Sequence, residues 1–403
     1  MSTIKVNSIK NTSTNDGGIT IDNSGHVQID GQQLATAGAL SHRNIVINGA
    51  MLVNQTGTVT SAGLGGADRF ATNSSMTVSG YGIESSQQQD APANTGFQKS
   101  YQVKTTAAVT AGADSYVGFS THLEFQDIYR AIWAGNSHVT FSFWVKSSIT
   151  GTFGFSFNPC NVSESTGDGN RRVLHYSNYT ISAANTWEYK TIAVDMATFN
   201  SSYTVHDTGV DAQVGLGAQL TWTLDVISGG NRDDAALGWN TIASEVRNFV
   251  GNSSAADTGF SSTANATFKI TGVQFEIGAK ATPFEHKSYA EEFKRCKRYR
   301  QELDLGTDSN VLHMVFHRFG ASSGSGFSYI PFSTEMRAAP SFSFQGSVFD
   351  ASGYTGNPTL DASTPSGAQL SSTNSLGANA NAFLRPNNGS GDFLRLRFTS
   401  ELF

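Results

Sequence analysis

The residues best suited to ligand chemistry lie together in the stretch NRDDAALGWN. In a loop of a β-structured protein, its amide and carboxylate groups could bind Ca²⁺ or hydrogen-bond sugar hydroxyl groups, and its indole ring could stack on a pyranose. The spacing is not that of the D-x-D-x-D-G calcium loop, and a polar turn with a tryptophan anchored in the core is the competing interpretation. The candidates are Asn231, Asp233, Asp234 and Trp239.

Two further stretches, SGYTGNP and RPNNGSG, combine turn residues with groups that could contact a sugar. An aromatic ring beside an amide can meet a glycan, and loops on a rigid sandwich commonly carry recognition residues. Ordinary turns are the alternative at each of these positions. The candidates are Tyr354 and Asn357 in the first stretch and Asn387 and Asn388 in the second.

The motifs that could indicate an enzyme or a metal site do not meet their structural requirements. Gly320 to Gly324 matches G-x-S-x-G, but a nucleophile elbow needs a helix after the motif, and the residues that follow predict a strand. His313 and His317 on a strand would lie roughly 13 Å apart, too far to share a metal ion. We therefore expect no enzyme activity, no metal ion and no cofactor.

The net charge and the two cysteines indicate which partners and which cellular compartment to expect for the protein. The formal net charge is −6, and the basic run from Lys294 to Arg300 shares its segment with glutamates. We therefore expect a solvated helix face or a subunit contact, and no nucleic-acid partner. Cys160 and Cys296 fit no metal pattern and are expected to be free thiols, which suits assembly in a reducing cytoplasm. No signal-peptide pattern and no stretch of membrane-spanning length is present.

The composition predicts an all-β protein of two or three domains. Charged residues make up 14% of the chain, which also has 41 Gly and 27 Phe. Turn formers with β-branched and aromatic residues favour strands, and the phenylalanines argue against disorder. We expect four segments: a short β anchor for attachment and trimerisation at 1–40, a jelly-roll β-sandwich at 41–287, a connecting α-helix at 288–303, and a smaller C-terminal β-sandwich, the tip, at 304–403.

The clearest strand is HVTFSFWVKSS, in which the odd positions from Val139 to Val145 are apolar and should face the core. Trp144 and Trp187 lie within strand patterns, and we expect both in the core. The alternating runs within residues 1–40 carry too few apolar side chains for a core of their own. That segment must therefore dock on copies of itself or on another protein.

One charged helix interrupts the β pattern. Ser288 is a good N-cap, and Glu291 three residues later completes the pattern of a capping box. The apolar side chains recur at helical spacing and should pack against the sandwich or against its symmetry mates. They are Tyr289, Phe293, Cys296, Tyr299 and Leu303.

Several stretches together carry a family resemblance. GVQFEIGAKATPFEHKSYAEEFKRCKRYRQ, from Gly272 to Gln301, resembles the segment that closes a carbohydrate-binding-module-like jelly roll in tail-fibre-like proteins of tailed bacteriophages. RNIVINGAMLVNQ is similar to the opening of that domain, and FSTEMRAAPSFS to the start of the next one. MSTIKVNSIKNTS resembles the virion-attaching start of marine podovirus (cyanophage-type) fibres. Where the family often has DRW, this chain has DRF, at Asp68 to Phe70.

The resemblance implies a homotrimeric, non-enzymatic tail fibre of the phage virion, made in the host cytoplasm. Residues 1–40 would attach it to other tail proteins, and its distal β domains would bind host surface polysaccharide. Two alternatives remain: a structural adaptor or capsid-decoration protein, and a glycan depolymerase. Depolymerases usually contain a long β-helix, and the sequence shows no solenoid period.

Overall fold

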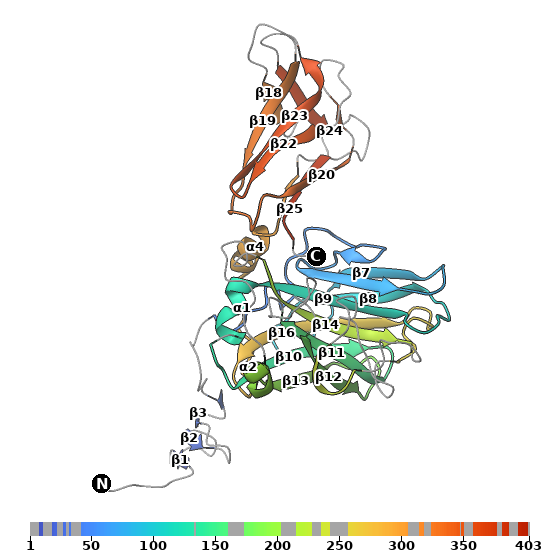
Figure 1. The fold of residues 1–403 in the computed structure, drawn as a ribbon, viewed down its shortest axis with the longest axis vertical. Helices are drawn as coiled ribbons and strands as arrows, with labels where there is room; N and C mark the ends of the chain where they lie inside the picture. The colour runs from blue at the N-terminus through green and yellow to red at the C-terminus, as the bar shows by residue number, and fades with distance from the viewer. Residues whose placement is uncertain are drawn as a thin grey trace, which may run out of the picture.

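In the computed structural model, antiparallel β-sheet is the main regular structure of the described residues (Figure 1). Two sheets form a central sandwich, and smaller sheets are formed by the two ends of the chain. The all-β class predicted from the composition is confirmed. The structure describes residues 8–10, 18–21, 27–29, 32–33, 42–132, 134–159, 173–202, 215–227, 235–241, 257–304, 314–317, 324–346, 348–349, 358–376, 381–386 and 394–401.

The N-terminal strands form a four-stranded meander in the order β1-β2-β3-β4. Ile9 pairs with Ile19 across β1 and β2, and Ile19 pairs with Ile29 across β2 and β3. Ile9 and Ile19 are 61% and 39% exposed, so these two side chains form an apolar row that the rest of the chain does not cover. The strands are β1 (Ser8–Lys10), β2 (Gly18–Ile21), β3 (Val27–Ile29) and β4 (Gln32–Gln33).

The sandwich consists of a five-stranded and a seven-stranded sheet. The first has the order β13-β10-β16-β8-β7, with β7 (Gly82–Gln88), β8 (Ser100–Ala107), β10 (His138–Ser147), β13 (Glu188–Asp195) and β16 (Thr267–Ile277). The second has the order β15-β12-β11-β14-β9-β6-β5, with β5 (Gly63–Leu64), β6 (Phe70–Ser75), β9 (Tyr116–Glu124), β11 (Gly151–Pro159), β12 (Val173–Ile181), β14 (Leu216–Val226) and β15 (Gly238–Thr241).

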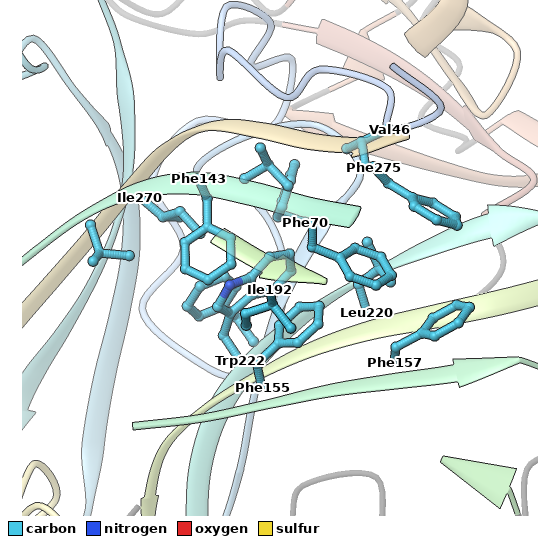
Figure 2. Packing of buried hydrophobic residues seen from close by; sticks show 14 of the residues in the cluster. Val46, Phe70, Phe143, Phe155, Phe157, Ile192, Leu220, Trp222, Ile270 and Phe275 are labelled. Atoms are coloured by element: carbon cyan, nitrogen blue, oxygen red, sulfur yellow. The ribbon is translucent and has the colours of Figure 1, made fainter. Parts of the chain in front are cut away.

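The core lies between the two sheets and is dominated by aromatic rings (Figure 2). Phe143 from β10 and Phe155 from β11 both meet the ring of Trp222, which stacks on Phe119 at 5.1 Å between centroids. The apolar positions of β10 from Val139 to Val145 are all buried, as their alternation predicted. Period-two alternation therefore assigned the inner face of this strand correctly.

The first and last segments of the sandwich are joined by carboxylates that accept backbone hydrogen bonds. Glu285 accepts from the N–H of Asn44 at 2.8 Å, and Glu292 accepts from the N–H of Asn48 at 2.5 Å. The glutamates of the charged stretch thus hold the opening stretch of the domain in place.

In the described ranges, three helices accompany the sheets: α1 (Phe125–Ile132), α2 (Ala197–Ser202) and α4 (Tyr289–Lys297). The Ser288 side chain caps α4 by accepting from the Glu291 N–H at 3.2 Å, as predicted. The expectation of a helix that continues to residue 303 is wrong, because the helix ends at Lys297. Beyond it the chain pairs with the last strand, and this long-range pairing outweighs the local helical pattern.

The C-terminal part contains a three-stranded and a six-stranded sheet. The first has the order β17-β25-β20, with β17 (Arg300–Asp304), β20 (Ser341–Gly346) and β25 (Leu394–Thr399). The second has the order β21-β24-β18-β19-β23-β22, with β18 (Met314–His317), β19 (Gly324–Pro331), β21 (Val348–Phe349), β22 (Pro358–Thr364), β23 (Gly367–Leu376) and β24 (Asn381–Pro386). A small core includes Met336, Leu370 and Phe398.

Two of the motifs considered as metal or enzyme sites include described residues of this C-terminal part. His317 lies on a strand, as expected, whereas His313 lies outside the described residues. Gly324, the last residue of the G-x-S-x-G match, begins β19, so a strand follows the motif as predicted. Cys296 is a free, buried thiol, and Cys160 lies outside the described residues.

Candidate functional site

A pair of aromatic rings lies on the outer face of the five-stranded sheet. Trp144 of β10 is directly opposite Tyr189 of the edge strand β13. Their ring centroids are 5.2 Å apart, with the ring planes inclined at 43°. Tyr189 is 44% exposed, so the pair presents aromatic surface to solvent.

The expectation that Trp144 and Trp187 belong to the core is wrong. Phe143 and Val145 face the interior, and the side chain between them must point to the opposite face of the sheet. Trp187 is half-buried immediately before β13, and its indole N–H donates to Asp90 at 3.1 Å. Both tryptophans therefore lie outside the core, half-buried, beside Tyr189.

The Asp90 carboxylate joins this aromatic group to two lysines. Lys146 and Lys269 are direct neighbours on β10 and β16, and their ammonium groups donate to Asp90 Oδ2 at 2.9 and 2.6 Å. The Lys146 ammonium group also lies 5.9 Å from the Trp187 ring centroid. We call Trp144, Trp187 and Tyr189, together with Asp90, the aromatic platform.

The protonation state of Asp90 limits the chemistry of the platform. Burial acts to raise the pKa of this carboxyl group, but the three hydrogen bonds that it accepts outweigh burial and lower the pKa to about 2. Asp90 is therefore an ionised hydrogen-bond acceptor at neutral pH and has no proton to donate as a general acid.

The loop after β7 lies over the neighbouring part of the same sheet face. The Phe97 ring lies over Gly272, where an added Cβ would be 2.5 Å from the Phe97 Cζ atom. Phe284 and His286 pack on Phe97, each with a ring-centroid distance of 4.9 Å. These three rings cover Gly272, which follows Thr271, the residue paired with Trp144.

The outer face of the seven-stranded sheet is polar but not accessible. Tyr176 is opposite Ser156, which is opposite Thr221, so their hydroxyl groups form a row across three strands. All three side chains are at most 1% exposed. Ala235 packs against Tyr176 on this face. Because these hydroxyl groups are buried, the platform on the other sheet is the better candidate for contact with a large ligand.

A cavity of about 390 Å³ lies where α1, α4 and the opening segment of the sandwich meet. Two of its cations are already paired: Lys287 with Glu285 at 2.8 Å, and Arg295 with Glu292 at 3.3 Å. No Phe, Tyr or Trp ring lines it, so it lacks the broad stacking surface that the platform offers. Its lining residues are His42, Asn44, Ile45, Asp127, Lys287, Glu291, Lys294 and Arg295.

Of the residues expected to bind a glycan, the structure describes Trp239. Its indole N–H donates to the Asp195 carbonyl oxygen at 2.9 Å, and its ring packs on Phe199 with centroids 4.9 Å apart. It is half-buried and anchored against the core, which is the competing interpretation for this residue. Asn231, Asp233, Asp234, Tyr354, Asn357, Asn387 and Asn388 lie outside the described residues.

The aromatic platform was not identified from the sequence, although part of it left a signal. Trp144 occupies an outward position in an alternating strand, and Trp187 and Tyr189 stand two apart in NTWEYK. Asp90 lies in a loop and follows no motif, so only the fold brings it to the two lysines. Within the described ranges, no three His, Cys, Asp or Glu side chains converge as a metal site. No described helix is long and apolar enough to cross a membrane.

Comparison with known proteins gives structural similarities alone. No protein-family model and no curated protein sequence matches the chain. The enzymatically active domain of tailspike protein 4 from bacteriophage CBA120 is similar over 58% of this chain and 21% of that chain, with 12% identity and a TM-score of 0.29.

Two carbohydrate-binding modules are also similar. The family 11 module from Clostridium thermocellum, solved with a mixed-linked β-1,3-1,4 tetrasaccharide, shares 13% identity over 57% of this chain and 98% of that chain, with a TM-score of 0.26. A family 4 module shares 10% identity over 57% of this chain and 98% of that chain, with a TM-score of 0.25.

Proposed function

We propose that this protein is a non-enzymatic bacteriophage tail fibre that binds glycan on the host surface through its β domains. In this proposal it is a homotrimer in the virion, attached to other tail proteins by residues 1–40. The aromatic platform on the jelly-roll sandwich is one of its glycan-binding surfaces.

The observation that carries the binding proposal is the pair formed by the exposed Tyr189 ring and the half-buried Trp144 ring, beside the ionised Asp90 network. A pyranose has a face of C–H groups that packs on an aromatic ring, and hydroxyl groups at its edge that need hydrogen-bond partners. The platform offers both kinds of contact within one surface. Lys146 and Lys269 hold Asp90 in place before the ligand arrives, so little ordering cost remains.

The absence of hydrolysis is part of the proposal. Glycoside hydrolysis by the usual route needs two carboxyl groups, one of them protonated as the general acid. Asp90 is ionised at neutral pH because its pKa is lowered to about 2. The platform therefore supports binding in preference to a depolymerase activity.

The fibre assignment has support from the sequence and from the N-terminal sheet. The stretch from Gly272 to Gln301 resembles tail-fibre-like proteins. The N-terminal meander leaves Ile9 exposed, which fits a segment that docks on other copies or on a tail protein. A capsid-decoration protein would carry the same kind of docking segment. Cryo-electron microscopy of the intact virion distinguishes the two, because tail and capsid positions differ.

An array of bacterial surface polysaccharides tests the binding proposal with full-length protein. We expect Trp144→Ala and Tyr189→Ala each to weaken binding by about tenfold, the loss of one aromatic contact of roughly 1.4 kcal/mol. Tyr129→Ala is the matched control, because this tyrosine is 48% exposed on α1, outside the platform. Binding that is absent in the wild type, or unchanged in both platform variants, contradicts the proposed role.

A further inference from the structure

The C-terminal six-stranded sheet has one face that carries exposed aromatic and hydrogen-bonding side chains. Phe327 and Tyr329 of β19 are 37% and 62% exposed, whereas Ala368 and Leu370 of the neighbouring strand β23 are buried in the core on the other face. We call the outward residues the Tyr329 face. They are Phe327 and Tyr329 of β19, Gln369 and Ser371 of β23, and Thr359 and Asp361 of β22.

Tyr329 lies over the backbone of the neighbouring strand. A Cβ added to Gly367 of β23 would be 2.2 Å from the Tyr329 hydroxyl oxygen and 2.5 Å from its Cζ atom. The phenol end of the ring therefore occupies the space that a side chain at Gly367 would fill. Because the ring lies on a glycine and is still 62% exposed, it presents a broad surface to solvent.

The polar side chains beside Tyr329 are held by hydrogen bonds to one another. The Gln369 amide donates to Asp361 Oδ2 at 2.7 Å, and the hydroxyl groups of Thr359 and Ser371 are 2.9 Å apart. These pairs cross from β23 to β22, so they form a polar strip alongside the aromatic residues of β19. Hydroxyl, amide and carboxylate groups in such a strip can both donate to and accept from sugar hydroxyl groups.

We propose that the Tyr329 face binds an uncharged, extended polysaccharide, with sugar rings on Phe327 and Tyr329 and their hydroxyl groups on the polar strip. This inference rests on the proposed glycan-binding function and gives it a second surface, separate from the aromatic platform. Phe327 and Tyr329 are two residues apart on one side of a strand, roughly 7 Å, so one chain can contact both rings.

The charge of the face selects the class of glycan. None of its six residues is cationic, and the one charged group is Asp361. An anionic polymer would be repelled by this carboxylate and would find no ammonium or guanidinium partner on the face. A neutral polymer is not repelled, and the Asp361 carboxylate can accept hydrogen bonds from its hydroxyl groups.

Affinity electrophoresis of full-length protein tests the inference. The gels contain dextran, mannan or mixed-linkage β-glucan as neutral polysaccharides and alginate as the anionic one. We expect at least one neutral polysaccharide to retard the wild type and alginate not to do so. Tyr329→Ala should weaken the retarding interaction by about tenfold, whereas Tyr329→Phe should keep it because the ring remains.

Gly367→Ala supplies a second, independent variant. The added methyl group would lie 2.2 Å from the Tyr329 hydroxyl oxygen and 2.9 Å from the Ile330 carbonyl oxygen. It must displace the Tyr329 ring, so we expect it to weaken binding in the wild type and to have a much smaller effect in the Tyr329→Ala background. Thermal melts of Tyr329→Ala and Tyr329→Phe should match that of the wild type, because Tyr329 is largely exposed. A Gly367→Ala effect of equal size in both backgrounds would overturn the inference.

The remaining outcomes separate this inference from its alternatives. If the Trp144→Ala variant loses binding and the Tyr329→Ala variant keeps it, the inference fails and the proposed function stands. If Tyr329→Ala changes the mass measured by light scattering, the face is an interface between copies of the chain, and the inference fails. Retardation by none of the neutral polysaccharides also overturns it.

Discussion

Arg298 donates two hydrogen bonds to the Glu124 carboxylate, at 2.8 and 2.9 Å, and thereby ties the end of the charged helix to strand β9. Glu124 is fully buried, and the Arg298 side chain is 28% exposed. A hydrogen bond to Glu124 raises the pKa of Arg298, so this guanidinium group stays charged. The helix is charged in part because one of its cations neutralises a carboxylate buried in the sandwich.

Replacement of Arg298 by alanine should destabilise the protein strongly, because it leaves Glu124 buried without its charged partner. Loss of one member of a buried ion pair typically costs about 3–5 kcal/mol. Arg298→Lys should restore only part of the lost stability. It keeps the positive charge, but an ammonium group cannot make the two parallel hydrogen bonds of a guanidinium group. Urea unfolding gives the free energy directly.

Arg295→Ala is the matched control on the same helix. Arg295 is 27% exposed and its contact with Glu292 is longer, at 3.3 Å, so we expect a cost of at most about 1 kcal/mol. Equal destabilisation by the two variants would refute the special role of the Arg298–Glu124 pair.

The last described residue, Glu401, should also be important for stability. It forms an ion pair with Arg69, whose guanidinium group is buried and lies 3.4 Å from the centroid of the Tyr299 ring. Glu401→Gln keeps the shape but removes the charge, so Arg69 would be buried without its counter-ion. We expect a fall of several degrees in melting temperature, as for other broken buried pairs. Glu335→Gln, at an exposed position, should leave the melting temperature unchanged.

Acid should weaken the fold within a definite range of pH. The pKa values of Asp90 and Glu188 are both lowered to about 2, from ordinary values of 3.8 and 4.5. Because the folded pKa lies below the unfolded one, the stabilisation is fully present above pH 4.5 and is lost as pH falls toward 2. Melting temperatures measured from pH 6 to pH 2 should therefore fall in this window. The melting temperature of the Asp90→Asn variant should fall less steeply over this pH range. If it falls in parallel with that of the wild type, Asp90 does not contribute to the acid sensitivity.

The sequence predicted local structure well where neighbours along the chain decide it. The alternation from Val139 to Val145 identified the inner face of β10, and the Ser288 cap marked the start of the helix. Both signals come from residues within one strand or one helical turn. The end of that helix was not predictable in this way, because strand pairing between β17 and the distant strand β25 determines it.

In the candidate site, too, local sequence predicts some features and long-range contacts determine the others. Alternation places Trp144 on the outer face of β10, but its exposure depends on which strand lies next to it and on what covers the sheet. Asp90 is brought to Lys146 and Lys269 by a loop that crosses between strands distant in the sequence. No periodicity or motif records such a contact. A tryptophan within a strand pattern is therefore expected in the core, although the fold leaves Trp144 on the outer face.

The exposed isoleucine row of the N-terminal sheet predicts how the chain assembles. Ile9 and Ile19 are paired across β1 and β2 and are 61% and 39% exposed, so replacing both with aspartate should not disturb the sandwich. If the row is covered by other copies, the charges would be forced into an apolar contact and the trimer should dissociate. Light scattering should give a trimer for the wild type and a smaller mass for the Ile9→Asp, Ile19→Asp variant. Val78→Asp, at a 40% exposed position on the sandwich, is the matched control and should remain trimeric. A monomeric wild type would rule out the trimer, and a trimeric double variant would place the contacts between copies elsewhere in the chain.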